Sequence, residues 1–287
     1  MKTIAIILLA ALTLFTSCGS TKRNNFIVLV DNSLTVPETV FERYIQTIQQ
    51  SIIAKMGSKD RLTVQFIDGC SQSMAERVYS IDLAAMDFSS DADGINYKED
   101  SAAARLKKFV TDSVVSEVRR VILAKRKERN SDVKNKCSQF TDIIGALNEA
   151  KSLINKKRNY SNTKDKILND ADGKDSYEYV TSIIIFSDMV NENNERTFDF
   201  TQMGKLKSDG VEKKVQELKD IDKIPDMANI NVVAYGATST KEAGPFANKQ
   251  IENVKLFWEL FFKSAGADLK GYGYDTNAEI KGLVADN

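Results

Sequence analysis

The stretch FIVLVDNSLTVPE, residues 26–38, decides how this chain begins to fold. Its first five residues are all apolar, which is typical of a strand buried on both faces, as in a parallel sheet. Asp31 follows this run directly, Ser33 and Thr35 come at alternate positions after it, and Pro37 suits the first turn of a helix. The stretch therefore predicts a buried strand, then a turn rich in side-chain oxygens, then a helix.

The same alternation of strands and helices continues along the chain. Further strands are expected at 62–67, 77–83, 179–187 and 230–236, and amphipathic helices at 37–56, at 101–127, from near Thr141, and around 251–265. Strands that alternate with helices predict an α/β fold with a doubly wound, mostly parallel sheet flanked by helices. Residues 84–137 are long for one connection and predict a helical insertion, and the polar segment 155–178 predicts a second insertion as a surface loop.

The N-terminal residues resemble an export signal. Lys2 precedes a short apolar run, and residues 1–17 end in small residues directly before Cys18. This arrangement resembles a bacterial lipoprotein signal, which implies a lipid anchor on Cys18 and a protein held at the cell envelope. An ordinary cleaved signal peptide is the alternative, and the sequence does not indicate which face of the membrane the protein occupies.

The expected domain organisation follows from this reading. A short linker is expected at 18–25, one domain at 26–275 and a C-terminal tail at 276–287. Export leaves Cys70 and Cys137, which an oxidising compartment would allow to form a disulfide; two buried thiols are the equal alternative.

Composition limits the chemistry that this chain can perform. The 287 residues include 40 basic and 40 acidic side chains, so bulk charge does not indicate a nucleic-acid partner. There is no histidine, which excludes histidine-based catalytic triads and ordinary zinc sites. A bound metal would therefore need oxygen ligands, which suit Mg²⁺, Mn²⁺ or Ca²⁺.

Oxygen-bearing side chains follow several of the predicted strands. In an open parallel sheet, ligands bind where the carboxyl ends of the strands meet the loops that follow them. Two carboxylates and several hydroxyls are expected to meet at this edge and to form a magnesium site. The expected ligands are Asp31, Ser33, Thr35, Thr141 and Asp188.

The order of these residues resembles the von Willebrand factor A domain family. DNSLT, Thr141 in FTDIIGAL and Asp188 in IIIFSDM match the metal-ion-dependent adhesion site of that family, which has Asp-x-Ser-x-Ser, a later Thr and a later Asp. Thr35 stands where Ser is usual, and Met189 stands where Gly is common. The resemblance implies that hydroxyls bind the metal directly, that the carboxylates often act through water, and that an acidic side chain of a protein partner completes the shell. It implies binding and not an enzyme.

Two other functions remain open at this stage. The chain could be an envelope scaffold or assembly factor that uses the insertion at 84–137 and no metal. It could also be a magnesium-dependent phosphatase of the haloacid dehalogenase type, but Ser33 stands where that family needs an acidic residue to protonate the leaving group. The basic run from Arg119 to Arg129 is expected to be the solvated face of a helix.

Overall fold

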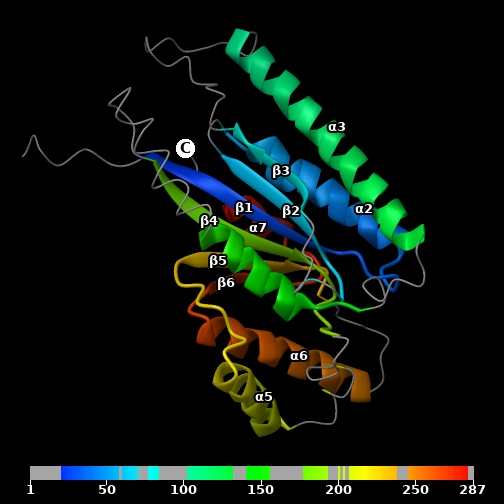
Figure 1. The fold of residues 1–287 in the computed structure, drawn as a ribbon, viewed down its shortest axis with the longest axis vertical. Helices are drawn as coiled ribbons and strands as arrows, with labels where there is room; N and C mark the ends of the chain where they lie inside the picture. Colours follow the sequence, from blue (N-terminus) through cyan, green and yellow to red (C-terminus); the bar gives the residue numbers. More distant parts are fainter. Residues whose placement is uncertain are drawn as a thin grey trace, which may run out of the picture.

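The computed structural model describes residues 21–57, 60–69, 71, 77–83, 102–131, 140–155, 177–192, 200, 203, 207–237 and 245–283. In these residues one six-stranded sheet has the order β3-β2-β1-β4-β5-β6 (Figure 1). The strands are β1 (Thr21–Asp31), β2 (Arg61–Ile67), β3 (Arg77–Asp82), β4 (Tyr177–Phe186), β5 (Ile230–Tyr235) and β6 (Asp268–Gly273). The expected α/β class with a mostly parallel sheet is therefore confirmed.

The central strand β1 sets the topology of the sheet. It pairs in parallel with β2 on one side and with β4 on the other, and β5 and β6 continue the sheet in parallel beyond β4. The strand β3 is antiparallel to β2 and lies at the edge. Since the chain runs from β1 outward to β3 and then returns to β4, the direction of winding reverses between β1 and β4.

Helices cover both faces of the sheet. One face carries α2 (Glu38–Thr47), α3 (Ala102–Ser131) and α7 (Asn277–Leu283); the other carries the helix over residues 143–155, α5 (Ser208–Asp220) and α6 (Pro245–Ser264). The expected helix at 37–56 is α2 continued by a π-helical turn, Ile48–Ile52, and a 3-10 turn, Ile53–Lys55. Alternate residues of β1 enter the two apolar cores, with Val28 and Val30 on the α2 side and Ile27 and Leu29 on the other.

The structure corrects the expected linker at 18–25. β1 begins at Thr21, so the last five residues of that linker already belong to the sheet and pair with the first residues of β4. Polar residues can be buried there because they find hydrogen-bond partners. The backbone N–H of Asn24 donates to Asp60 Oδ1 at 2.8 Å, and Asn25 Nδ2 donates to Thr181 Oγ1 at 3.3 Å.

The C-terminal tail expected at 276–287 is also corrected. Its residues 277–283 form α7, which buries Ile280 and Leu283 against the core on the α2 side. Two further elements, α5 and the edge strand β6, were not expected from the sequence. The apolar residues of α7 are too few for periodicity to identify so short a helix.

Several sequence predictions lie outside the described residues. These are the signal at 1–17, Cys18, Cys70, Cys137 and most of the insertion at 155–178. Within the insertion at 84–137, the described part is α3, which bears out the expected helix. In the part of the chain that the structure describes, no helix is both long and apolar enough to span a membrane.

Candidate metal centre

Asp31 is the last residue of β1 and lies at the carboxyl edge of the sheet. Its side chain is buried, with 1% of its surface exposed. Oδ1 accepts a hydrogen bond from the backbone N–H of Ser33 at 2.9 Å, and Oδ2 accepts one from the Ser187 hydroxyl at 3.0 Å. The first bond closes the turn after β1, and the second joins the ends of β1 and β4.

The two hydroxyl side chains after Asp31 lie against each other. Ser33 Oγ and Thr35 Oγ1 are 2.9 Å apart, so the alternate spacing does place both oxygens on one side of the turn. Ser33 is buried, whereas Thr35 and Leu34 are exposed. The hydroxyl pair therefore leads from the buried carboxylate of Asp31 to the surface.

The end of β4 supplies the second carboxylate. Asp188 lies one residue beyond the buried Ser187, and its Oδ1 accepts a hydrogen bond from the backbone N–H of Val190 at 2.9 Å. The Ser187 hydroxyl also accepts a bond from the backbone N–H of Met189 at 3.1 Å. Ser187, which was not among the expected ligands, thus connects both carboxylate-bearing turns.

Burial disfavours the charged form of both carboxylates, and the charge of Asp188 further disfavours that of Asp31. Burial, together with the nearby negative charge of Asp188, raises the pKa of Asp31 to about 6 from its ordinary value of 3.8, although bonds from Ser33 and Ser187 act to lower it. Desolvation by the surrounding protein also raises the pKa of Asp188, although this residue is partly exposed to solvent. Burial and the same two carboxylates raise the pKa of the Tyr44 hydroxyl, which therefore stays protonated. The site has an excess of negative charge that a cation would offset.

Thr141 is brought to the loop that carries Asp188. It is buried and forms an isolated antiparallel bridge with Glu192, whose backbone N–H donates to the Thr141 carbonyl at 2.8 Å. Next to it, Asn191 Oδ1 accepts bonds from the first backbone N–H groups of the helix over 143–155, at 2.8 and 3.1 Å. Asn191 therefore caps this helix and fixes the segment of Thr141 beside the end of β4.

Arg126 of α3 binds the turn after β1 through hydrogen bonds. The sequence did not predict this contact. This arginine is buried and donates to Asn32 Oδ1 at 3.2 Å, to the Val36 carbonyl at 2.9 Å and to Glu38 Oε2 at 3.2 Å. Its guanidinium also lies 3.9 Å from the ring centroid of Phe41. The partners flank both ends of the turn, so Arg126 fixes its path.

The basic run of α3 is therefore not simply a solvated face. Arg129 forms an ion pair with Asp68, a buried carboxylate just after β2. Arg119 and Glu42 pair at 2.8 Å, whereas Arg120 and Lys125 pair within α3, with Glu117 and Glu128 respectively. Three of these arginines thus attach α3 to the sheet or to α2, because their charges meet carboxylates on those elements.

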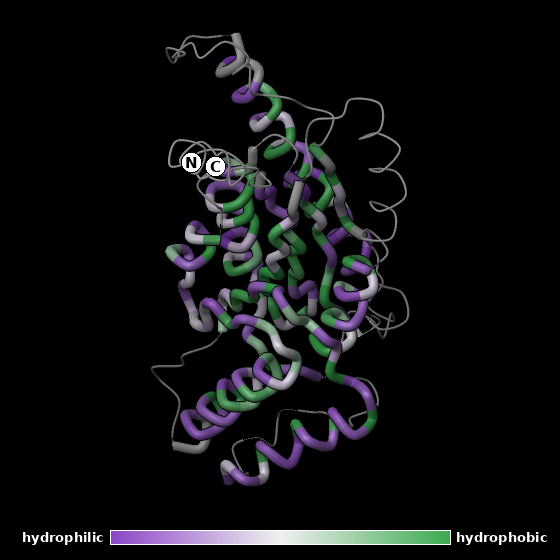
Figure 2. Tube along the Cα trace, turned by 90° about the vertical axis from the view of Figure 1, so that its left-hand side faces the viewer, coloured by the Kyte–Doolittle hydropathy of each residue, from purple (hydrophilic) through white to green (hydrophobic). Residues whose placement is uncertain are grey.

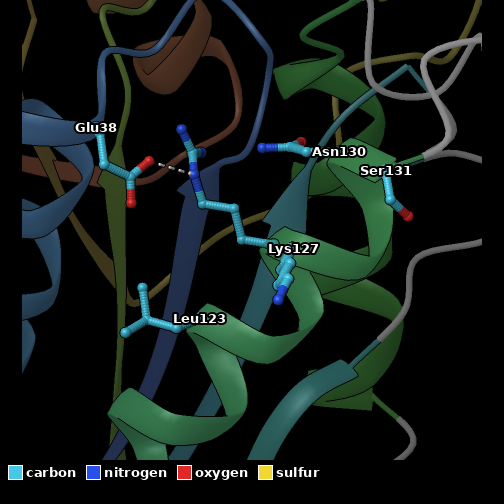
Figure 3. A pocket seen from close by; sticks show the side chains of 6 residues that line it. Glu38, Leu123, Lys127, Asn130 and Ser131 are labelled. Carbon is cyan, nitrogen blue, oxygen red and sulfur yellow. Dashed lines mark hydrogen bonds and ion pairs between the residues drawn. The ribbon is translucent and has the colours of Figure 1, made fainter.

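A groove of about 400 Å³ lies where the end of α3 meets the start of α2. Figure 3 shows the side chains that line it, with the Arg126–Glu38 ion pair at one side. The lining residues are Glu38, Leu123, Arg126, Lys127, Asn130 and Ser131. Two of them, Arg126 and Glu38, are already paired with each other, so we assign no ligand to this groove.

Met189 has a backbone conformation that is uncommon for a residue other than glycine. Its φ is +66°, in the left-handed region that glycine adopts without strain. The methionine side chain is fully buried, and its carbonyl accepts a hydrogen bond from Trp258 Nε1 of α6 at 2.8 Å. Burial and this bond offset the backbone strain at Met189.

The donor set is suited to a hard cation. Two carboxylates and the hydroxyls of Ser33, Thr35 and Ser187 gather at the ends of β1 and β4, with Thr141 tied to the same loop. Oxygen ligands of this kind suit Mg²⁺, which takes one or two carboxylates and keeps several waters. Among the described residues, no group of three or more His, Cys, Asp or Glu side chains gathers at one point, so a metal here would depend on the hydroxyls.

Comparison with known proteins adds little to this picture. No family model and no curated protein sequence matches the chain. Among solved structures, proximal thread matrix protein 1 from the mussel byssus is similar to 92% of this chain, with 8% sequence identity and a TM-score of 0.34. The similar part covers 47% of that chain, and a likeness at this level carries no argument about function.

Proposed function

We propose that this chain is a cell-envelope binding protein with a von Willebrand factor A-like domain that engages a protein partner through a divalent cation. Asp31, Ser33, Thr35, Thr141 and Asp188 would hold the ion, with Mg²⁺ as the first candidate and Mn²⁺ or Ca²⁺ as alternatives. When bound, the ion offers an open coordination position to an acidic side chain of the partner. The proposal includes neither an enzymatic activity nor a nucleic-acid partner.

One observation carries this proposal. Asp31 ends β1 and Asp188 follows β4, the two strands between which the winding of the sheet reverses. Burial, together with the negative charge of Asp188, raises the pKa of Asp31 to about 6. Ligands of doubly wound sheets bind at this reversal point, and the strand order of this sheet is the one found in dinucleotide-binding folds of that type. A bound cation would offset both the cost of burying the Asp31 charge and its repulsion by the charge of Asp188.

The surface around the site also fits a protein partner. Leu34, between the two hydroxyl-bearing residues, is 44% exposed although it is apolar. An exposed leucine next to a charged centre can enter the core of an interface while the ion binds an acidic side chain of the partner. Arg126 would position this turn without touching the ion, because it contacts Asn32 and Val36 instead.

Partner capture from an envelope extract, with Mg²⁺ and with chelator, tests the proposal. Asp31→Ala should abolish capture, and a chelator should abolish capture by the parent chain. Asp209→Ala, an exposed carboxylate in the first turn of α5, is the matched control and should capture normally. Capture that survives Asp31→Ala but is lost when the insertion at 84–137 is deleted would instead support the metal-independent scaffold.

A further inference from the structure

The first turns of α3 form an exposed surface that the candidate metal site does not use. Phe109 is 70% exposed, more than Leu34, Ile221 or Tyr274, the other exposed large apolar side chains of the described part of the chain. The side chains of Arg105, Lys107 and Lys108 around it are exposed as well. We call these four residues, Arg105, Lys107, Lys108 and Phe109, the α3 tip.

The α3 tip projects beyond the body of the molecule. Figures 1 and 2 show the first turns of α3 extending past the end of the sheet. Among the side chains of α3 whose exposure the structure describes, the first buried one is Val114, with 7% of its surface exposed. Val110, one residue after Phe109, already contacts the core on the α2 side. At this turn α3 still touches the core through Val110, and Phe109, about 100° round the helix from Val110, is left exposed.

The charge of the α3 tip differs from that of the whole chain. The chain has a formal net charge of zero. The tip has three positive side chains, and the described residues 102–112 contain one acidic residue, the exposed Asp112, which leaves a formal charge of +2 over this described stretch. An aromatic side chain among basic residues is the combination found on helices that bind the surface of an anionic bilayer.

The position of the α3 tip relative to the start of β1 favours a membrane over other partners. α3 runs in the same general direction as β1, so the tip and Thr21 lie toward the same end of the molecule (Figure 1). Exposed Lys22 adds a further positive charge at the start of β1. Cys18, on which a lipid anchor is expected, precedes Thr21 by only three residues, so an anchor would hold this end at the bilayer.

We propose that the α3 tip docks on an anionic lipid bilayer. Phe109 enters the boundary between headgroups and acyl chains, while the basic side chains bind headgroup phosphates. Docking at this end directs the opposite end of the parallel strands, which carries Asp31 and Asp188, away from the membrane. The proposal does not depend on a bound metal, because no residue of the α3 tip belongs to the candidate metal centre.

Vesicle co-sedimentation tests this proposal. The chain from Thr21 to Asn287 keeps every described strand and helix and lacks Cys18, so any binding is independent of a lipid anchor. We expect it to bind vesicles that contain phosphatidylglycerol, to release them in high salt, and not to bind pure phosphatidylcholine. Since each basic side chain contributes about fivefold to such binding, the double variant Lys107→Glu/Lys108→Glu should bind at least about twentyfold more weakly.

Matched variants separate this surface from general effects. Phe109→Ser should weaken vesicle binding several-fold. The matched controls make the same kinds of change at exposed positions on α5 or just after it. Ile221→Ser and Lys213→Glu/Lys219→Glu should bind vesicles as well as the parent does. Unchanged fluorescence of the buried Trp258 would show that each variant is folded. The proposal is overturned if the parent chain ignores anionic vesicles, or if the tip variants bind as well as the parent. Self-association that Phe109→Ser removes, without vesicle binding, would assign the surface to a second copy of the chain.

Discussion

Replacement of Asp31 by Asn should stabilise the metal-free protein at neutral pH while it abolishes metal binding. The Asp31 carboxyl is 1% exposed, and its pKa of about 6 lies above its ordinary value of 3.8. The folded chain therefore binds this proton more tightly than the unfolded chain does. The stability that the protonated group provides is fully present below about pH 4 and is lost as the pH rises through about 6.

The structure sets the size of this effect. At about 1.4 kcal/mol for each pH unit between the two pKa values, the ionised carboxylate destabilises the fold by roughly 3 kcal/mol at pH 7. The Asn side-chain oxygen can still accept from the Ser33 N–H. Its NH₂ group takes the place of the oxygen that accepts from the Ser187 hydroxyl, and an NH₂ group cannot accept that bond. Loss of that bond costs about 1 kcal/mol, so the variant should be about 2 kcal/mol more stable than the parent in chelator at pH 7.

Urea unfolding measures this difference. Trp258, the single tryptophan, is buried in α6 and reports unfolding by fluorescence. The parent and Asp31→Asn are compared in chelator from pH 4 to pH 7. The other carboxylates titrate in both proteins, so their contributions to the free energy of unfolding cancel in the difference. Excess Mg²⁺ should then stabilise the parent by about 2.7 kcal/mol at one hundred times its dissociation constant, and leave the variant unchanged. A stability difference that is the same at pH 4 and pH 7 would refute the reasoning.

Two other substitutions test the supports of the site. Arg126→Gln should lower the free energy of unfolding by about 2 kcal/mol, because it removes bonds to the Val36 carbonyl and Glu38, and it should also weaken Mg²⁺ binding in calorimetry. Gly236→Ala should cost about 2 kcal/mol or more in urea unfolding, because φ is +93° and an added Cβ would lie 2.6 Å from the Tyr44 hydroxyl oxygen. Gly282→Ala, with open space around the new Cβ, is the control and should be neutral or slightly stabilising. Equal effects of the two glycine changes would contradict this account of Gly236.

The central strands could be predicted from the sequence because their signal is strong and local. The apolar runs of β1 and β4 are buried on both faces, and an uninterrupted apolar run indicates this directly. The turn after β1 was also predictable in outline, since alternate residues after a strand can direct their oxygens to one side. The 2.9 Å contact between the Ser33 and Thr35 hydroxyls agrees with that expectation.

Other features depend on partners that are distant in the sequence. Asn24 and Asn25 looked like part of a linker, yet they are buried, and their side-chain N–H groups donate to Asp60 and to Thr181 respectively. Arg126 looked like one member of a solvated basic run until α3 was placed against the turn after β1. Periodicity within one segment carries no information about such contacts, so the sequence could not reveal them.

Calorimetric titration of Mg²⁺ and Mn²⁺ into the chain from Thr21 to Asn287, beside Asp188→Ala, tests the central claim most directly. Asp188 is exposed, so its removal should leave the fold intact, and Asp209→Ala serves as the control. The account predicts saturable binding of one ion to the parent and to the control, and none to Asp188→Ala. Binding that persists in Asp188→Ala, or a parent that binds neither ion at pH 7, would contradict the proposed metal centre.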